Sequence, residues 1–518
     1  MLPLMVVLSA AAADRTVAPG ESIQAALNEA SPGDIITIEP GTYEEDLSTE
    51  VDGEEDRPIV VRAAEPGSVV ITSAGEVLQV DHRYWRFTGL VFDGQFGSAD
   101  TLDINDHADH LVLSEVEVRR SGRDCIDMGS PSGVEIRDSH IHHCLHYNRD
   151  DEVRVDAHGI TGGAVQDLKI IDTDIHTFSG DAIQFDPGRE APGWNNITVQ
   201  GCRLWLEPLE EDTNGFLAGQ VPGENAIDTK TVPEGERATL IVADTEAWGF
   251  RDGVDFSNQA AFLLKENVDV TVRRVHVYDS EMAFRVRGAT DSSPEGAVVR
   301  VESSLIHHVE VGVRYEDDLS ELKLWHITFG AGVTAPFSNG DSDTASVAVI
   351  NSLFLTDELP VEATQDESNS IATSDDFVDA ADHDYHLVED SLAIDAGVPI
   401  TGVTQDLDGN RRVSGLGPDL GAYEWDEETD SGLFDDDTGR LGEDSDPTDS
   451  DEGADDGATD DTAEPDSPRS EPGGGVGAAD RVGERGGCGC TTPISTASRM
   501  WPWLVMPLLV RRRRVYTA

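Results

Sequence analysis

Charged and amide side chains recur at matching positions in short strand-like segments between residues 100 and 316. Each segment has a small or apolar residue followed by alternating apolar and polar ones. The segments are DTLDIN (100–105), DCIDMG (124–129), HGITGG (158–163), DAIQFD (181–186), NAIDTK (225–230), MAFRVR (282–287) and VGVRYE (311–316). One more segment falls between 230 and 282, either DGVDFS (252–257) or AAFLLK (260–265), and the spacing does not decide between them.

If these segments stack on successive turns of a repeat, like positions form rows. One row contains Asp103, Asp127, Thr161, Gln184, Asp228, the undecided Asp255 or Leu263, Arg285 and Arg314. The second contains Asn105, Gly129, Gly163, Asp186, Lys230, the undecided Ser257 or Lys265, Arg287 and Glu316. Residues two apart share one face of a strand. We therefore predict a long face that is acidic at one end and rich in Lys and Arg at the other.

Such a face suits a uronate-containing saccharide. In β-elimination a cation or Arg neutralises the uronate carboxylate, and a Lys or Arg of lowered pKa removes the C5 proton. We predict Lys230 as the base and Arg285 or Arg287 as the carboxylate partner. Asp127, Gln184, Lys265 and Arg314 are predicted to contact substrate, and Asn225, Asp228 and Asp186 to bind a cation.

Two other interpretations of this face stay open. The charges can form an exposed, salt-linked ladder on a non-catalytic protein that binds glycan or serves in adhesion. A glycoside hydrolase needs an acid and a base that flank the scissile bond, and Asp124 with Asp127, or Asp181 with Asp186, could supply them.

The element that must position these rows is a strand repeat. A pattern of alternating apolar residues, with another apolar position four residues on, starts at residues 85, 111, 134, 168, 197, 240, 270, 299, 322 and 347. A minimum spacing of 23 residues with occasional insertions is typical of a solenoid with one coil per repeat. We predict an all-β fold, a right-handed parallel β-helix of about ten coils over residues 85–384.

Both ends of this rod need caps, because open strand edges invite association. Residues 14–84 are predicted to form the N-terminal cap and first strands, with Ser22 capping a helix that turns Ile23, Ala26, Leu27 and Ala30 inward. The segment SIQAALNEASPGDIITIEPGTY (22–43) resembles the N-terminal cap of pectate-lyase-like proteins. Residues 385–426 resemble the closing segment of bacterial β-helix proteins. There Asp395, Asp406, Asp408 and Asp419 could hold a cation, although turn formation and capping are the favoured roles.

The cap, the coils and the segment GENAIDTKT (223–231) together resemble the alginate lyase and chondroitinase B family of polysaccharide lyases. That family has two Glu calcium ligands shortly before a catalytic Lys, and a catalytic Arg about one coil later. The resemblance implies Ca²⁺ as cofactor, Lys230 as the base and Asn225 at one ligand position. The other ligand position falls on Gly223, with Glu224 beside it. Arg251 has the family's separation, whereas the repeat phase favours Arg285 or Arg287.

Histidine and cysteine offer further chemistry. His140, His142, His143, His146 and His158 cluster in the sequence, as a metal site or, more simply, as solvated side chains. His142 and His176 occupy like positions on neighbouring coils and are predicted to stack. Cys125 and Cys144 could form a disulfide, but we predict two buried thiols.

The formal net charge of −66 excludes nucleic-acid binding or anionic-lipid binding through the overall field. It equally suits adaptation to salty surroundings. A polyanionic substrate would need a local basic patch or a bridging cation.

The two ends of the chain are predicted to be targeting segments. Residues 1–13 form an apolar run that ends in small residues, as in a signal peptide. Residues 427–487 are acidic and rich in Gly, Pro and Ser, which predicts a disordered linker. Residues 488–518 contain Cys-Gly-Cys, an apolar run and four Arg, and resemble the C-terminal sorting signal of myxobacterial surface proteins. The expected location is the cell surface, outer membrane or exterior, with the export and sorting machinery as partners and membrane contact only through the anchor.

Overall fold

A computed structural model describes residues 12–186, 193–230, 235–254, 256–289, 295–340, 347–356, 359 and 365–426. The signal and anchor segments predicted at 1–13 and 488–518, and the linker at 427–487, lie outside these residues except for residues 12 and 13. Within the described part, no helix has the length and apolarity needed to cross a membrane.

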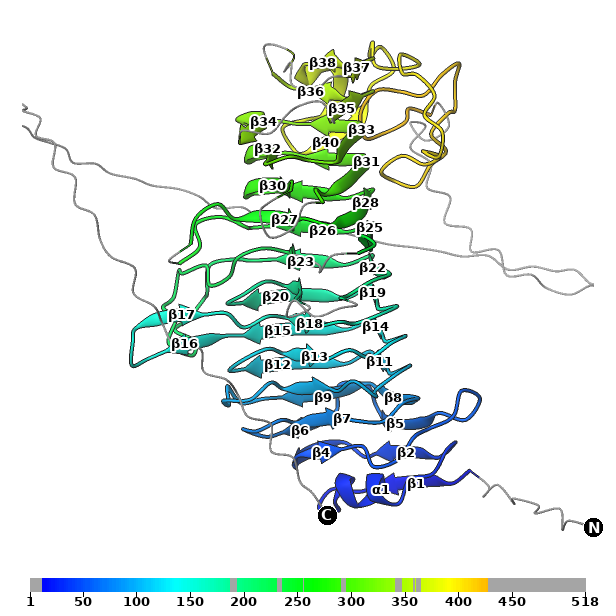
Figure 1. The fold of residues 1–518 in the computed structure, drawn as a ribbon, viewed down its shortest axis with the longest axis vertical. Helices are drawn as coiled ribbons and strands as arrows, with labels where there is room; N and C mark the ends of the chain where they lie inside the picture. The colour runs from blue at the N-terminus through cyan, green and yellow to red at the C-terminus, as the bar shows by residue number, and fades with distance from the viewer. Residues whose placement is uncertain are drawn as a thin grey trace, which may run out of the picture. The chain divides into compact units, whose positions relative to one another are not determined.

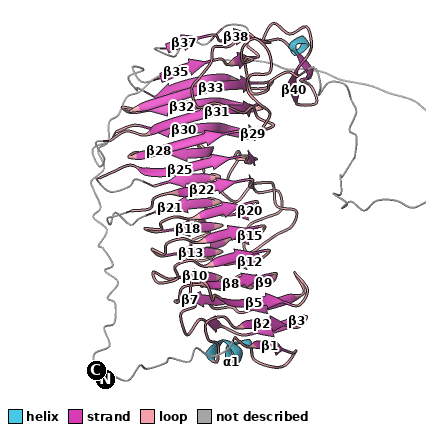
Figure 2. Ribbon diagram, turned by 90° about the vertical axis from the view of Figure 1, so that its right-hand side faces the viewer, coloured by secondary structure: helices cyan, strands magenta, loops and turns pink. Residues whose placement is uncertain are grey.

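Parallel strands stack coil upon coil and build a right-handed parallel β-helix, as predicted (Figure 1; Figure 2). Each coil contributes two consecutive strands to one sheet and a third to another. We call the two strand series of the larger sheet the first and second ladders, and the smaller sheet is sheet B.

The first ladder contains β1 (Asp14–Val17), β2 (Ile35–Ile38), β5 (Ile59–Ala63), β8 (Trp85–Thr88), β11 (Val112–Ser114), β14 (Glu135–Arg137), β19 (Lys169–Ile171), β22 (Ile197–Gln200), β25 (Ala238–Ala243), β28 (Val268–Arg273), β31 (Val298–Ile306), β33 (Glu321–Phe329), β35 (Val347–Ile350) and β37 (Gln365–Glu367). The second contains β3 (Gly41–Glu44), β6 (Val69–Thr72), β9 (Leu90–Asp93), β12 (Glu117–Ser121), β15 (His140–Cys144), β20 (Asp174–Phe178), β23 (Arg203–Trp205), β26 (Glu246–Trp248), β29 (His276–Tyr278), β36 (Leu353–Phe354) and β38 (Ser370–Ile371). The long strands β31 and β33 belong to both ladders.

Sheet B contains β4 (Leu47–Ser48), β7 (Leu78–Val80), β10 (Leu102–Ile104), β13 (Ile126–Met128), β18 (Ile160–Gly162), β21 (Ile183–Phe185), β24 (Ile227–Thr229), β27 (Ala260–Leu264), β30 (Ser280–Arg287), β32 (Val309–Glu316) and β34 (Ala335–Gly340). Outside the stack lie α1 (Ile23–Asn28) and two antiparallel hairpins, β16 (His146–Asn148) with β17 (Val153–Val155) and β39 (Phe377–Asp379) with β40 (Asp384–Leu387).

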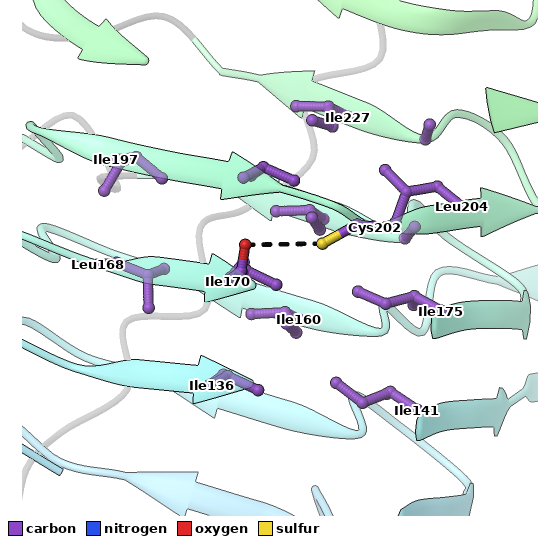
Figure 3. Packing of buried hydrophobic residues seen from close by; sticks show 14 of the residues in the cluster. Ile136, Ile141, Ile160, Leu168, Ile170, Ile175, Ile197, Cys202, Leu204 and Ile227 are labelled. Carbon is purple, nitrogen blue, oxygen red and sulfur yellow. Dashed lines mark hydrogen bonds between the residues drawn. The ribbon is translucent and has the colours of Figure 1, made fainter. Parts of the chain in front are cut away.

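The register of the first ladder follows the sequence repeat. For example, Val112 pairs with Glu135, and Leu240 pairs with Val270, as their repeat starts require. Because the strands of every coil are parallel and in register, inward-facing Ile, Val and Leu stack into one continuous core. Figure 3 shows this stacking for Ile136, Ile170 and their neighbours.

A single left-handed residue turns the chain between the first and second ladders in most coils. The residues with positive φ at this corner are Gly89, Glu115, Asp138, Asp172, Gly201, Asp244, Arg274, Ser303, His326 and Asn351. The next residue along the chain is buried, and it is often Ser or Thr, whose side chain carries a hydroxyl. Thr245 Oγ1 donates to the carbonyl of Ala243 at 2.7 Å, and Ser304 Oγ donates to Glu302 at 2.7 Å. Cys202 takes this position in its coil, and its thiol contacts the carbonyl of Ile170 at 3.6 Å (Figure 3).

The predicted caps close both ends. Ser22 accepts the Ala25 N–H at 3.1 Å and so caps α1, and Ile23 and Leu27 are fully buried. At the other end Asp395 and Asp419 accept backbone N–H groups, as the favoured capping role requires. Arg412, within this closing segment, is buried and donates to the Ala422 carbonyl at 2.7 Å.

Cys125 and Cys144 form a disulfide, so the prediction of two free thiols was wrong. Cys144 pairs in register with Ser121 on β12, and Cys125 directly precedes β13, the next strand of that coil. Coil stacking therefore brings the two Cα atoms to 5.4 Å, a separation that a disulfide spans. The spacing of 19 residues gave no indication of this, because it depends on the coil length.

Candidate functional site

Sheet B carries the predicted rows in the predicted order. Asp103 pairs with Asp127, Gln184 with Asp228, and Arg285 with Arg314. Of the two segments that could fill the remaining coil, 252–257 or 260–265, the structure places 260–265 in the sheet. Strand β27 lies between β24 and β30 and pairs Leu263 with both Asp228 and Arg285. Lys265 thus comes after Lys230 in the second row.

Asp228 is the centre of an ion-pair cluster with both lysines. Its carboxylate lies 2.5 Å from the Lys230 ammonium and 2.9 Å from that of Lys265. Although Asp228 belongs to the outward row, it is only 1% exposed. This negative charge, together with that of Asp181, raises the pKa of Lys230 against the lowering effect of burial. Lys230 is therefore a firmly protonated cation, whereas a catalytic base needs a lowered pKa.

The arginines of the next two strands surround one glutamate. Arg285 donates through Nε and Nη2 to Glu316 at 2.9 and 2.7 Å, and Arg314 donates through Nε at 2.9 Å. Arg287 lies 3.6 Å from the same carboxylate. Against the raising effect of burial, the guanidinium groups of Arg314 and Arg285 hold the pKa of Glu316 below its usual range. A guanidinium has five N–H donors, so Glu316 leaves Arg285 with donor capacity for a ligand.

A second, internal column lies beside this face, where each coil enters sheet B. Its side chains are Asp100, Asp124, His158, Asp181 and Asn225. Each accepts the backbone N–H of the next coil at between 2.7 and 3.2 Å. The column therefore links successive coils by side-chain to backbone hydrogen bonds. Its signal was visible in the segments DCI, HGI, DAI and NAI, whose first residue is always a hydrogen-bond acceptor.

This column fixes the roles of two predicted site residues. His158 Nδ1 accepts the Asp181 N–H at 2.8 Å, and burial lowers the pKa of His158, so the ring is neutral. Asn225 donates Nδ2 to Asp181 at 2.7 Å, while its Oδ1 accepts the N–H of Ala260 at 3.0 Å. Burial and the nearby Asp228 raise the pKa of Asp181. Asn225 is thus a buried link between coils.

Arg154 is a member of this site that sequence reasoning missed. It lies on β17, 70 residues before Glu224, and its Nη2 bonds to Glu224 Oε1. Burial raises the pKa of Glu224 above its usual range despite this partner. No sequence signal pointed to Arg154, because the β16–β17 hairpin is an insertion outside the repeat.

The predicted calcium ligands do not form an oxygen cage in this arrangement. Calcium takes six to eight oxygen ligands. The carboxylate of Asp228 is held by two lysines, Glu224 is held by Arg154, and the amide oxygen of Asn225 accepts a backbone N–H. Asp186 lies at the end of β21 with an exposed side chain. The donor set therefore does not fit a resident calcium ion.

Two further predictions concern residues near this face. Arg251 lies between β26 and β27, off the ladder, and its exposed side chain pairs with Asp252 at 3.3 Å. Register thus places Arg285 and Arg287, not Arg251, beside the lysines. For the hydrolase alternative, Asp181 is 1% exposed and bonded within the column, so it does not face a substrate.

The opposite end of sheet B is acidic, as predicted. Asp103 and Asp127 are adjacent in register, and Asp124 lies beside them in the internal column. Burial, with added repulsion from neighbouring carboxylates, raises the pKa of each of the three to about 6. Clustered carboxyl groups with raised pKa values are a frequent feature of functional sites, although structural networks show them too.

The histidines fall into separate places. His142 stacks on His176 with ring centroids 5.2 Å apart, as predicted, and His140 and His143 lie against them. The column of rings continues through Trp205, Trp248, Tyr278 and His307. His146 lies on the β16 hairpin strand and His158 in the internal column, so the five histidines of the sequence cluster do not converge.

Comparison with known proteins gives a partial family match. Residues 17–112 match the family model of chondroitinase B. This segment covers the N-terminal cap and first coils, and contains none of the Lys or Arg residues of the cationic end. No curated protein sequence matches the chain significantly.

Several solved structures are similar to this chain at low sequence identity. Pectate lyase Pel9A is 17% identical over 80% of this chain and 97% of its own, with a TM-score of 0.39. An alginate lyase from Paenibacillus sp. str. FPU-7 is 17% identical over 65% of this chain and 99% of its own, with a TM-score of 0.37. The A-module of the Azotobacter vinelandii mannuronan C-5 epimerase AlgE4 is 14% identical over 62% and 94%, with a TM-score of 0.42. At these values the likeness concerns the β-helix, and the site rests on this chain's own geometry.

Proposed function

We propose that this chain binds acidic polysaccharide along the cationic face of sheet B, defined as Lys230, Lys265, Arg285, Arg287 and Arg314. The supporting observation is that these five cations lie on, or directly after, four successive strands of one sheet in a strongly acidic protein. Two of the four lysines of the entire chain lie there on adjacent coils. Arg and Lys are the side chains that bind carboxylates and sulfates, and Arg does so with two parallel hydrogen bonds.

The face is an open row, which suits a polymer. Strands β24, β27, β30 and β32 span three strand spacings, about 14 Å in all. Asp228 and Glu316 hold these cations in place through ion pairs. Anionic groups of a ligand would share the guanidinium donors with Glu316, as anions commonly do at paired arginines.

Cleavage by β-elimination is the second candidate, and the pairing of Lys230 with Arg285 on nearby strands favours it by residue type. The Lys230–Asp228 ion pair opposes it, because Lys230 must lose a proton to act as a base. Turnover would therefore require a ligand that separates Asp228 from Lys230. Non-catalytic binding needs no such step.

We also propose that the protein is exported and held at the cell surface. The Cys125–Cys144 disulfide supports export, because such bonds persist in oxidising compartments. Residues 1–13, which resemble a signal peptide, would direct export, and residues 488–518, which resemble a sorting signal, would direct the protein to the cell surface.

Binding of the full chain to immobilised alginate, pectate, chondroitin sulfate and heparin-type chains tests the proposal. We expect Lys265→Ala and Arg314→Ala to weaken binding at least about tenfold, since each removes one charged hydrogen-bond donor. Lys169→Ala is the matched control, because Lys169 is exposed on β19 outside sheet B. Equal binding by all four proteins, or binding by none, would contradict the proposal.

The same polysaccharides, incubated with the parent protein and with Lys230→Ala, decide between binding and cleavage. Ultraviolet absorbance reports unsaturated uronate ends, measured with calcium and with a chelator. A signal that disappears in Lys230→Ala would establish a lyase. Binding without any such signal would establish a non-catalytic surface protein.

A further inference from the structure

Three histidines meet where the last full coils contact the C-terminal hairpin. His307 and His308 come directly after β31, and His383 lies in the turn between β39 and β40. One ring nitrogen from each lies within 4.8 Å of those of the other two. Among the residues that the structure describes, no other group of His, Cys, Asp or Glu meets this condition.

Packing holds the hairpin and the coil together at this point. Tyr385 of β40 is 1% exposed, shares a core cluster with Leu305 of β31, and its hydroxyl accepts the Ala331 N–H at 2.8 Å. His308 and His383 have φ values of 49° and 67°. These left-handed turns direct two chain segments far apart in the sequence to one spot.

The rings already have the arrangement of a ligand set. His307 Nδ1 lies 2.8 Å from His308 Nδ1, and the His383 ring centroid lies 4.5 Å from that of His307 and 4.7 Å from that of His308. Zinc binds imidazole nitrogens at about 2.0–2.1 Å, which puts ligand nitrogens about 3.3 Å apart in a tetrahedral site. Side-chain shifts of about 1 Å would satisfy this geometry.

Partners on the two preceding coils orient the buried ligand. His307 is 1% exposed, and its Nε2 lies 2.7 Å from Nε2 of His276. His276 Nδ1 in turn lies 3.7 Å from Glu246. A metal-bound histidine usually passes its second N–H to such a partner. With Nδ1 on a metal, His307 would donate Nε2–H to His276.

We propose that His307, His308 and His383 bind a divalent transition-metal ion of the zinc class, and that this ion ties the β39–β40 hairpin to the coil. Neutral imidazole suits Zn²⁺, Cu²⁺, Ni²⁺ and Co²⁺, whereas Ca²⁺ prefers oxygen ligands. The three side chains leave a fourth position for water. This site is independent of the polysaccharide-binding face.

Metal binding to the full chain tests the assignment. The protein carries no polyhistidine tag, and free thiols are alkylated because Cys488 and Cys490 could also take up zinc. Zn²⁺ binding is measured by calorimetry, and Co²⁺ is added as a spectroscopic probe. We expect one tight equivalent of Zn²⁺, and a rise in Tm on addition of the ion.

Variants locate the ion. His308→Asn and His383→Asn keep a residue that tolerates positive φ, and each should weaken Zn²⁺ binding at least about tenfold and remove the Tm rise. His143→Asn is the matched control, because His143 also has a positive φ of 58° and lies in the other group of stacked histidines. Retained binding in His143→Asn supports the proposal. Loss in His143→Asn instead, equal binding by all proteins, or no tight binding would overturn it.

Discussion

At the scale of single residues, Asp228 decides the chemistry of the cationic face. It is buried, it contacts both Lys230 and Lys265, and it raises the pKa of Lys230. Lys230 is of the residue type that suggested a catalytic base, but its ion pair with Asp228 keeps it protonated. The geometry observed therefore favours the proposed anion binding over proton abstraction.

Replacing Asp228 by Asn should strengthen binding of acidic polysaccharide while destabilising the fold. The two ammonium groups lose their carboxylate partner and become available to a ligand. Because Lys230 is one-third exposed, we expect a cost of about 1–3 kcal/mol, below that of breaking a fully buried pair. Chemical unfolding and the binding assay measure both effects. Asp174→Asn, at a solvent-accessible ion pair with Arg203, is the control. It should change the free energy of unfolding by less than about 1 kcal/mol and leave polysaccharide binding unchanged. Weaker polysaccharide binding in Asp228→Asn would count against this view of the face.

The carboxyl groups of Asp103 and Asp127 should make stability fall as pH rises. Their pKa values are about 6 in the folded chain, against about 3.9 for unfolded Asp. Between pH 4 and 6 the native state therefore holds more protons, so its stability decreases with pH and the full penalty applies above about 6. Asp103→Asn and Asp127→Asn should each stabilise the protein by on the order of 1–2 kcal/mol at pH 7.5, and by almost nothing at pH 4. Urea unfolding at both pH values checks this, and an equal gain at both would disprove the titration argument.

At the scale of elements, the corner between ladders and the turn into sheet B hold the coils in register. Ser and Thr hydroxyls donate hydrogen bonds to backbone carbonyls at the buried corners. The column of Asp124, His158, Asp181 and Asn225 links successive coils by accepting backbone N–H groups. The alternating apolar pattern predicted the strands and their order. It did not predict the corners, because Glu115 and Arg274 adopt positive φ there although Glu and Arg rarely do.

The Cys125–Cys144 disulfide should stabilise the coil that contains it. It closes a loop of 19 residues, for which the chain-entropy argument gives about 3 kcal/mol. The double variant Cys125→Ser/Cys144→Ser should therefore unfold at lower denaturant than the parent. Cys202→Ser is the control, because serine already occupies the equivalent corner in other coils, for example at Ser139 and Ser304. A stability unchanged by the double variant, or unaffected by reduction, would show that the bond contributes little.

At the scale of the whole molecule, the charge of −66 should make stability depend on salt. Like charges on a compact chain repel one another, and mobile ions screen this repulsion within about 10 Å at 0.1 M. We expect Tm to rise as sodium chloride increases from about 0.01 to 1 M. Scanning calorimetry of the full chain measures this, with a neutral osmolyte at matched osmolality as control. A Tm that falls with salt would mean that attractive ion pairs outweigh the net repulsion.

The sequence by itself determined the repeat and most of its structural consequences. Because side chains stack at every coil, its periodicity predicted the strands, the order of the two charged rows and the stacking of His142 on His176. The tertiary structure alone decided the contacts made by segments outside the repeat. Arg154 reaches Glu224 from an inserted hairpin, and His383 meets His307 from the cap. The physical reason is that periodicity specifies neighbours within a ladder, whereas an insertion of variable length folds back to a position that only packing selects.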